Sequence, residues 1–227
     1  MLSVPLENLD YHIGRRIILD NSRLFAKIVL ERRGGVCYET NGLLSALLAE
    51  LGFDVEMISA GGALEEGGFD PPFDHMALLV RLNHLWLVDV GFGDSFCEPL
   101  LVDDQGEQGQ RGDLYRIMRD NEYLILQRRR QPNPWKNLYR FTLESCQYAD
   151  FAEMCHFQQT SPESPYTRSR VCTMATPGGR VTLLNRHLII TERGERTQRS
   201  ISSEEEYRTA LYQYFGIDLR DIRFETG

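Results

Sequence analysis

The chain has 227 residues, of which 42% are hydrophobic and 26% charged, an ordinary composition for a soluble globular protein. No apolar run approaches the roughly 20 residues that span a bilayer, and the N-terminus carries no basic and then apolar secretory signal. The net charge of −8 argues against nucleic acid as a partner, because phosphate binding needs clustered positive charge. The sequence therefore predicts no membrane-spanning helix and disfavours a nucleic-acid-binding protein.

The cysteines are odd in number and lack the spacing of a disulfide framework. This pattern predicts reduced thiols and a cytoplasmic location. Cys155 and His156 with Cys172 are the one combination that suggests zinc, but no paired Cys-x-x-Cys spacing supports it, so no metal is expected. The five cysteines are Cys37, Cys97, Cys146, Cys155 and Cys172.

Residues from about 20 to 51 are predicted to be helical, since leucines recur at i, i+3 and i+4 and Gly52 then ends the pattern. From about Phe53 the chain changes to short strands separated by Gly, Pro, Asn and Asp. The predicted strands are Val55–Ser59, Met76–Leu82, Leu85–Val90, Leu114–Met118, Tyr123–Gln127, Tyr139–Leu143, Arg170–Met174, Arg180–Leu184 and His187–Thr191.

Asn83 and His84 are typical of a two-residue hairpin turn between two strands. In that register Leu82 pairs with Leu85. Asp89 then lies three positions along from His75, a diagonal that a bulge or twist must shorten.

The last third combines short strands with a helix predicted over 204–215, for which a serine at 202–203 is the N-cap. The whole pattern predicts an α+β protein in three parts. Residues 1–53 form a helical bundle that carries the nucleophile, 54–155 an antiparallel β-barrel, and 156–227 a smaller α/β lobe.

Cys37 follows the segment Arg-Gly-Gly-Val, whose glycines let the backbone turn tightly before a helix. A thiol in the first helical turn meets free N–H groups and the positive end of the helix dipole, which favour the thiolate. Cys37 is therefore a candidate nucleophile. On this segment alone, a buried cysteine that packs as a small apolar side chain is an equal alternative.

His75 begins a predicted strand, where it can face a cleft and act as a general base or acid. Asp89 ends an apolar strand, where a carboxylate is expensive to bury without a partner. Asp89 on the neighbouring strand can orient the imidazole ring and stabilise its charged form. Taken alone, His75 also fits an ordinary surface or capped histidine.

Together these motifs resemble those of the arylamine N-acetyltransferase family, in order and over nearly the whole chain. The three triad motifs are Arg-Gly-Gly-x-Cys ending at Cys37, then His75, then Asp-Val-Gly-Phe-Gly starting at Asp89. Further segments that fit are Val-Pro-Leu-Glu-Asn-Leu-Asp (4–10), Ser-Pro-Tyr (164–166), Arg-Val-Cys (170–172) and Phe-Gly-Ile-Asp-Leu (215–219).

The resemblance implies a papain-like core made of a helical bundle, an antiparallel β-barrel and an α/β lid. It also implies a Cys37-His75-Asp89 triad that transfers an acetyl group from acetyl-CoA to an aromatic amine, hydrazine or N-hydroxyarylamine. The kinetics expected from a covalent cysteine intermediate are ping-pong.

The sequence departs from the family pattern at four points. Relatives carry roughly thirty further residues before the Pro-x-Glu-Asn-Leu segment, so either the start was set late or the helical part is trimmed. The 14-residue interval from His75 to Asp89 is one residue shorter than usual. Residues 71–74 replace a stretch of small residues, and this replacement predicts altered cofactor contacts. Val36 replaces a frequent bulky aromatic residue beside the nucleophile, which predicts a different acceptor pocket.

Phe92 is the candidate aromatic wall for the acceptor, with core packing as the alternative. Gly91 and Gly93 allow the loop backbone to approach CoA, and Ser95 is a candidate donor to it. A separate group, Arg33 with Glu7 and Asp10, is predicted to form a buried charge network that braces the nucleophile loop.

Three alternatives remain open from sequence. The first is an acyltransferase of the same fold with another donor or acceptor, such as an amide synthase that closes a macrolactam. The second is a hydrolase or transglutaminase-like enzyme with the same triad. The third is a non-catalytic relative that serves as an interaction protein.

Overall fold

The computed structural model describes residues 1–104 and 106–219. The chain divides into two compact units, Met1–Thr40 with Cys155–Gly227 and Asn41–Met154. Helix α2 (Cys37–Glu50) begins in the first unit and continues into the second. The predicted division at residues 53 and 155 into three parts stays a prediction.

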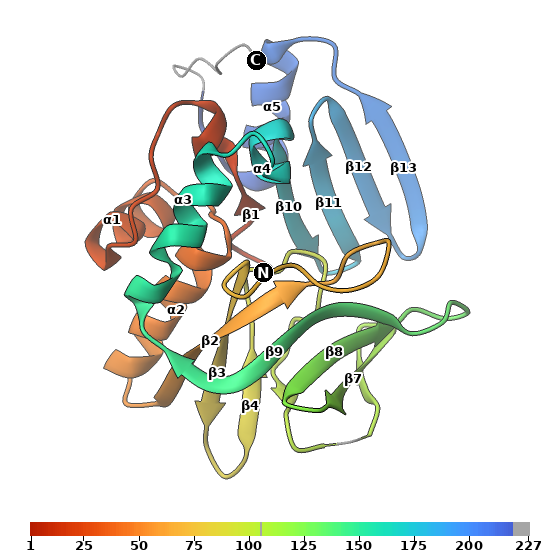
Figure 1. Cartoon of the computed structure of the whole chain (residues 1–227). Coiled ribbons are helices and arrows are strands. Elements are labelled where there is room, and N and C mark those ends of the chain that lie inside the picture. Colours follow the sequence, from red (N-terminus) through yellow and green to blue (C-terminus); the bar gives the residue numbers. More distant parts are fainter. Residues whose placement is uncertain (105, 220–227) are drawn as a thin grey trace. The chain divides into compact units, whose positions relative to one another are not determined.

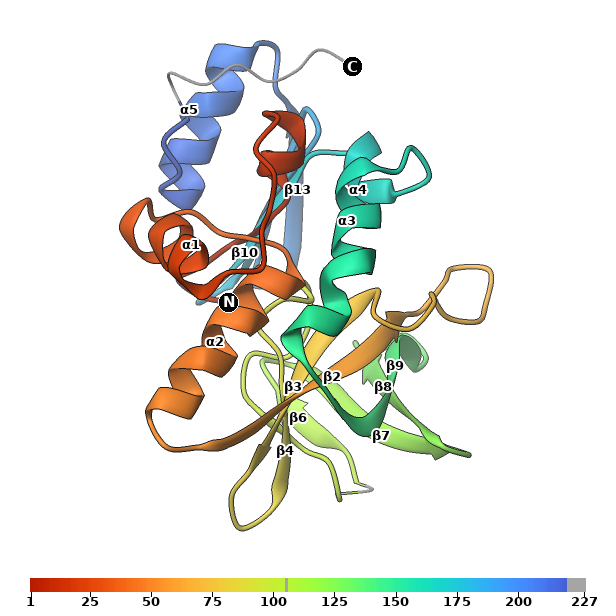
Figure 2. The ribbon, with the colours of Figure 1, turned by 60° about the vertical axis from the view of Figure 1, so that its left-hand side comes forward.

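The first unit contains an antiparallel sheet with the strand order β1-β10-β11-β12-β13 in its described residues (Figure 1). Figure 2 shows this sheet nearly edge-on, with α5 along one side. Leu183 of β11 and Leu211 of α5 are fully buried in the shared apolar core. The elements are β1 (Leu6–Glu7), η1 (Leu9–His12), α1 (Asn21–Phe25), η2 (Ala26–Leu30), the start of α2, most of α3 (Ala152–Thr160), α4 (Pro165–Arg168), β10 (Val171–Thr176), β11 (Gly179–Leu184), β12 (His187–Glu192), β13 (Glu195–Ser200) and α5 (Glu204–Phe215).

The second unit contains a strongly curved antiparallel sheet with the order β5-β4-β3-β2-β9-β8-β7-β6 in its described residues (Figure 1). Its two end strands are joined by a side chain, because Gln108 of β6 accepts from and donates to the backbone of Leu101 in β5. The sheet is thus a nearly closed barrel with an apolar interior. The elements are β2 (Asp54–Gly62), β3 (His75–Arg81), β4 (Leu85–Val88), β5 (Leu100–Leu101), β6 (Gln108–Gln110), β7 (Asp113–Asp120), β8 (Tyr123–Arg129), β9 (Lys136–Cys146) and η3 (Tyr148–Phe151).

The predicted α+β class is confirmed, and all nine predicted strands overlap strands of the structure. The last helix is also confirmed: Ser203 accepts the Glu206 amide at its start, and Gly216 ends it in the left-handed region at φ 70°. The helical structure predicted over about 20–51 is confirmed for 21–30 and 37–50, with the predicted glycine turn between the two segments. Helical structure stops at Leu30 and restarts at Cys37, and Arg32 between them has φ 53°.

The predicted hairpin register is wrong by one residue, because Arg81 pairs with Leu85 and the loop contains three residues. Continuing the observed register places Gly91 opposite His75. Asp89 lies two positions from Gly91, and residues two apart on a strand share a face. The shift therefore places His75 and Asp89 on the same side of the sheet, which the predicted register does not.

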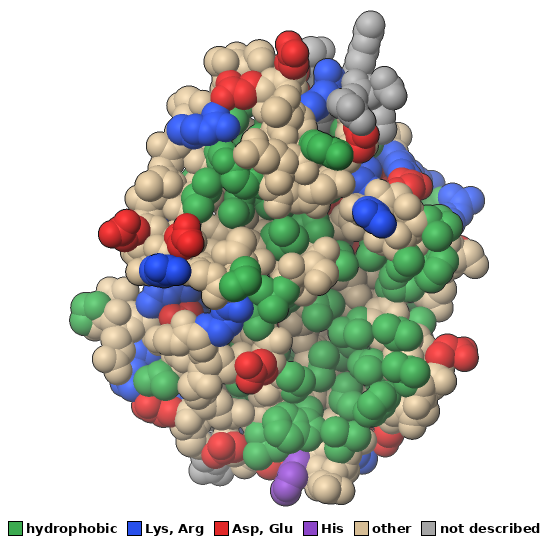
Figure 3. Space-filling view, turned by 180° about the vertical axis from the view of Figure 1, so that it is seen from behind, with side chains coloured by type: hydrophobic (Ala, Val, Ile, Leu, Met, Phe, Trp, Pro, Cys, Tyr) green, Lys and Arg blue, Asp and Glu red, His purple; other side chains and the backbone are tan. Residues whose placement is uncertain are grey.

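Several large apolar side chains of the second unit face solvent. Leu47, Leu51 and Leu82 are 55%, 65% and 57% exposed. Figure 3 shows hydrophobic side chains, in green, gathered in patches at the surface. In the part of the chain that the structure describes, no helix has the length and apolar character to traverse a bilayer.

Candidate active site

The turn before Cys37 is fixed by close backbone contacts. A Cβ on Gly34 would clash with the carbonyl oxygen of Pro5, and a Cβ on Gly35 would lie 2.8 Å from the Cβ of Glu39. The Gly35 carbonyl accepts the Glu7 amide at 3.1 Å, which joins the turn to β1. Neither glycine has a positive φ, so the pair is required for close approach rather than for a left-handed turn.

Cys37 is the first residue of α2 and a free thiol that is 6% exposed. The predicted position in the first helical turn is confirmed. Backbone N–H groups at a helix start have no intrahelical acceptors, so they favour negative charge near the sulfur. Cys37 is fixed at the start of α2 because the glycine turn directly before it is hydrogen-bonded to β1.

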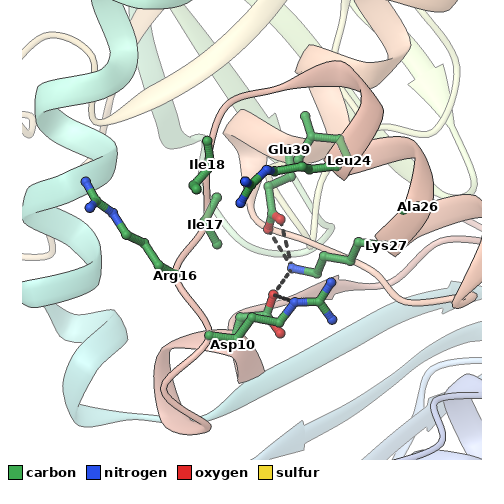
Figure 4. Close-up of a pocket in the computed structure, with 10 residues that line it drawn as sticks. Asp10, Arg16, Ile17, Ile18, Leu24, Ala26, Lys27 and Glu39 are labelled. Atoms are coloured by element: carbon green, nitrogen blue, oxygen red, sulfur yellow. Dashed lines mark hydrogen bonds and ion pairs between the residues drawn. The ribbon is translucent and has the colours of Figure 1, made fainter.

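The predicted network of Arg33 with Glu7 and Asp10 is present and buried. Arg33 Nε lies 2.8 Å from Glu7 Oε1, and Arg33 Nη2 lies 2.8 Å from Asp10 Oδ1. Lys27 and Glu39, which sequence reasoning missed, extend this network. Lys27 Nζ donates to Asp10 and to both oxygens of Glu39 (Figure 4). A charged residue on the inner face of an otherwise apolar helical segment was the sequence signal that could have identified them.

His75 and Asp89 form a buried pair in the second unit. His75 Nε2 lies 2.8 Å from Asp89 Oδ2, and the two residues are only 4% exposed. His75 begins β3 opposite Ala60 of β2, whereas Asp89 follows directly after the end of β4. The structure therefore brings together the two barrel residues that the sequence predicts.

Burial alone would raise the pKa of Asp89, but the charge and hydrogen bond of His75 lower it below its ordinary value. The Asn41 side chain and the Gly91 amide contribute in the same direction, at 2.9 and 2.8 Å from Oδ1. A carboxylate with several donors stays ionised even in a buried site. Asp89 can thus orient the His75 ring and stabilise its protonated form.

Asn41 is a second residue that sequence reasoning missed. Its Nδ2 donates to Asp89 and to the Met76 carbonyl, and its Oδ1 accepts the Val90 amide at 2.9 Å. It lies four residues after Cys37 in α2, on the same face of that helix. A buried amide one helical turn after a candidate nucleophile was the signal that could have identified it.

An aromatic group surrounds the His75 ring. The ring centroids of Phe92 and Tyr139 lie 5.2 and 5.1 Å from that of His75, and 5.1 Å from each other. Burial, followed by the nearby Asp89, raises the pKa of Tyr139 well above its ordinary value. Phe92 is partly buried against the barrel core, and Tyr139 is a further residue that sequence reasoning missed.

The predicted contact residues are placed as follows. Gly91 uses its amide to hold Asp89, and Gly93 has φ 87°. Ser95 is buried, and its hydroxyl has no hydrogen-bond partner among the described residues. Val36 is 3% exposed. Their roles toward CoA and the acceptor stay predictions.

The residues that the structure describes contain no group of three or more His, Cys, Asp or Glu side chains that could hold a metal ion. Cys155 and Cys172, named above for zinc, are both buried. Burial raises the pKa of the Cys155 thiol to about 12.

Comparison with known proteins agrees with this architecture. A sequence model of the N-acetyltransferase family matches residues 1–224. An arylamine N-acetyltransferase of Escherichia coli (strain K12) is 32% identical over 226 residues, which cover 97% of this chain and 80% of the relative. Proansamycin X synthase of Amycolatopsis mediterranei is 31% identical over 219 residues, covering 93% and 84%.

The solved structure of Mycobacterium marinum arylamine N-acetyltransferase in complex with CoA matches with a TM-score of 0.88 and 29% identity. That match covers 96% of this chain and 83% of the solved chain. The similarity in fold agrees with the family model, which matches almost every residue of this chain. This chain belongs to the arylamine N-acetyltransferase family of acyltransferases.

Proposed function

We propose that this protein transfers an acetyl group from acetyl-CoA to arylamines, hydrazines or N-hydroxyarylamines through a thioester on Cys37. The observation that carries the proposal is the buried His75–Asp89 pair, with 2.8 Å between Nε2 and Oδ2, in a chain of this family. The position of Cys37 at the start of α2 supports its role as the nucleophile. Acetyl-CoA as the donor is supported by the relative that was solved with CoA bound.

In the first half-reaction, the Cys37 thiolate attacks the thioester carbonyl carbon of the donor. A new C–S bond forms to Cys37, and the bond to the CoA sulfur breaks as the tetrahedral intermediate collapses. The departing CoA thiolate takes its proton from the His75 imidazolium. Backbone N–H groups around Cys37 are the proposed donors to the oxyanion.

In the second half-reaction, the acceptor nitrogen attacks the acetyl carbonyl and gives up a proton to His75. The C–S bond to Cys37 then breaks, which restores the thiolate and the imidazolium. Because Nε2 of His75 is hydrogen-bonded to Asp89, Nδ1 is the atom proposed to exchange these protons. Asp89 keeps the ring in the required tautomer.

The contact residues complete the proposal. Phe92 beside the His75 ring is the proposed wall for the aromatic acceptor, and Val36 is proposed to shape the same pocket. Gly91, Gly93 and Ser95 are proposed to approach CoA, for which the unpartnered buried hydroxyl of Ser95 offers a hydrogen-bond donor.

The decisive test is an acetyl adduct on the intact protein after incubation with acetyl-CoA, measured by mass spectrometry. Cys37→Ala should abolish the adduct, and Cys146→Ala, which removes another of the five thiols, should retain it. An arylamine should then discharge the adduct and yield the acetylated amine. An adduct that survives Cys37→Ala would remove Cys37 from its role.

A second candidate is acyl transfer with another donor or acceptor, such as amide synthesis. It is favoured by the match to a relative named Proansamycin X synthase at 31% identity. A panel of acyl-CoA and carrier-bound thioesters separates the two candidates, because each predicts a different donor for the fastest formation of the Cys37 adduct.

A further inference from the structure

A lysine is buried beside the nucleophile turn. Lys27 of η2 is 3% exposed, which is rare for a lysine unless it is paired. Its Nζ lies 2.9 Å from Asp10 Oδ2 and 2.8 and 2.9 Å from the two oxygens of Glu39. Figure 4 shows this ammonium group between the two carboxylates, at a cavity of about 180 Å³. All of its donors are directed at carboxylates.

Glu39 connects this lysine to the nucleophile turn. It lies two residues after Cys37 in the first turn of α2 and is 1% exposed. Its Oε2 accepts the amide of Val36, the residue directly before Cys37, at 3.1 Å. The missing Cβ of Gly35 leaves room for the Glu39 side chain to fold back over the turn. Glu39 is therefore part of the local structure that presents the sulfur.

The charges around this turn do not balance within the buried group. Three carboxylates face two cations there. Burial, against the attraction of Lys27, raises the pKa of Glu39 to about 7. The groups that interact electrostatically with Lys27, Glu39 or Cys37 include Glu7 of β1, Asp10 and Tyr11 of η1, Arg33 of the turn and Cys155 of α3.

We propose that Lys27 and Glu39 are a positioning pair for Cys37, which holds the turn in place and sets the charge that the sulfur experiences. This inference rests on the proposed role of Cys37. Lys27 supplies positive charge that favours the thiolate, and Glu39 offsets part of it while it anchors the Val36 amide. Neither side chain needs to touch the substrate.

The test follows the rate at which iodoacetamide alkylates Cys37, read by peptide mass spectrometry as a function of pH. Lys27→Met removes the positive charge and should raise the pH of half-maximal rate by about one unit. Glu39→Gln keeps an acceptor for Val36 but removes the negative charge, so it should lower that pH by a similar amount. The double variant should return close to the wild-type profile.

Arg16→Met is the matched control, because Arg16 lines the same cavity as Lys27 and should leave the profile unchanged. If Lys27→Met does not fold, the test depends on Glu39→Gln alone. A lower pH of half-maximal alkylation in that variant supports the proposal, and an unchanged pH contradicts it. Profiles that stay at the wild-type position, or that both move in the same direction, overturn the proposal. Because alkylation needs no acetyl-CoA, this failure is distinct from the absence of a wild-type acetyl adduct, which would refute the proposed function.

Discussion

Glu39 in the first unit and Asp89 in the second are both almost completely buried, at 1% and 4% exposure, but their pKa values shift in opposite directions. Burial, with the nearby Asp10 and Glu7 acting in the same direction and Lys27 against them, raises the pKa of Glu39 to about 7. Lys27 is the cation that Glu39 contacts, and Glu39 shares it with Asp10. Because Asp10 also contacts Arg33 and has a lowered pKa, Glu39 is the carboxyl group that more readily accepts a proton.

Asp89 experiences the same burial, but its neighbours are donors. His75, the Asn41 amide and the Gly91 N–H all bond to its oxygens, and together they lower its pKa against the effect of burial. The comparison shows that the balance of donors and competing carboxylates, rather than exposure, decides which buried acid stays ionised. The two units also differ in composition: the first surrounds the turn before Cys37 with a network of ions, and the second pairs one histidine with one carboxylate.

The largest effect is expected from breaking the histidine pair. Asp89→Asn can still accept the Asn41 and Gly91 donors through its oxygen, but it presents an amide to His75 and favours the wrong tautomer. We expect kcat/KM for acetyl transfer to fall by about 10³- to 10⁴-fold with little loss of fold. Asp113→Asn, in which the partner is Arg130 rather than a histidine, is the control and should retain activity. Equal losses in both variants would contradict the pairing argument.

The next effect tests the ion network. Arg33→Met leaves Glu7 and Asp10 without their shared guanidinium, so we expect the free energy of unfolding to fall by about 3–5 kcal/mol. Urea unfolding followed by circular dichroism measures this loss. Arg81→Met removes an exposed ion pair with Asp54 and should cost about 1 kcal/mol or less. Similar losses of unfolding free energy in the two variants would show that the buried network stabilises the fold no more than an exposed ion pair does.

The opposite pKa shifts predict opposite dependences of stability on pH. Glu39 binds more protons when folded than when unfolded, because its folded pKa of about 7 lies above the unfolded value of about 4.3. Its contribution to stability is therefore full below the unfolded value and is lost as pH rises to about 7. The Asp89 contribution is present above its unfolded value of about 3.9 and is lost as pH falls through its lower folded value.

Unfolding of the wild type and Glu39→Gln at about pH 5 and about pH 7.5 measures the first of these dependences. Relative to Glu39→Gln, the wild type should lose stability as pH rises. A difference that stays constant, or that grows in favour of the wild type, would show that Glu39 remains fully ionised.

The same comparison explains what the sequence could predict. The Arg-Gly-Gly-Val-Cys turn, the strand that starts at His75 and the apolar strand before Asp89 are local patterns, and each was placed correctly. The end of the first helical segment at Leu30, before the glycine turn, has no such signal, because it depends on a left-handed Arg32 and on pairing of the turn with β1. The hairpin register failed because the loop includes one more residue than its Asn-His pair indicates.

The supporting contacts were the hardest to predict because their partners are distant in sequence. Lys27 and Glu39 are 12 residues apart, and Asn41 and Asp89 are 48 apart. Periodicity within one helix shows that such a side chain faces inward, but it does not identify the group that satisfies it. Buried polar residues near a predicted nucleophile are therefore the positions where tertiary structure adds the most.

The smallest effect is expected at the aromatic wall. Phe92→Leu keeps an apolar side chain but removes the edge-to-face contact with His75, whose ring centroid lies 5.2 Å away. We expect KM for an arylamine to rise by about 3- to 10-fold, since a lost aromatic contact is worth about 1 kcal/mol. The rate of Cys37 acetylation by acetyl-CoA should stay within about twofold, because that step involves no arylamine. Stopped-flow measurement of each half-reaction separates the two, and a slower first half-reaction with an unchanged KM would assign Phe92 to the support of His75 instead.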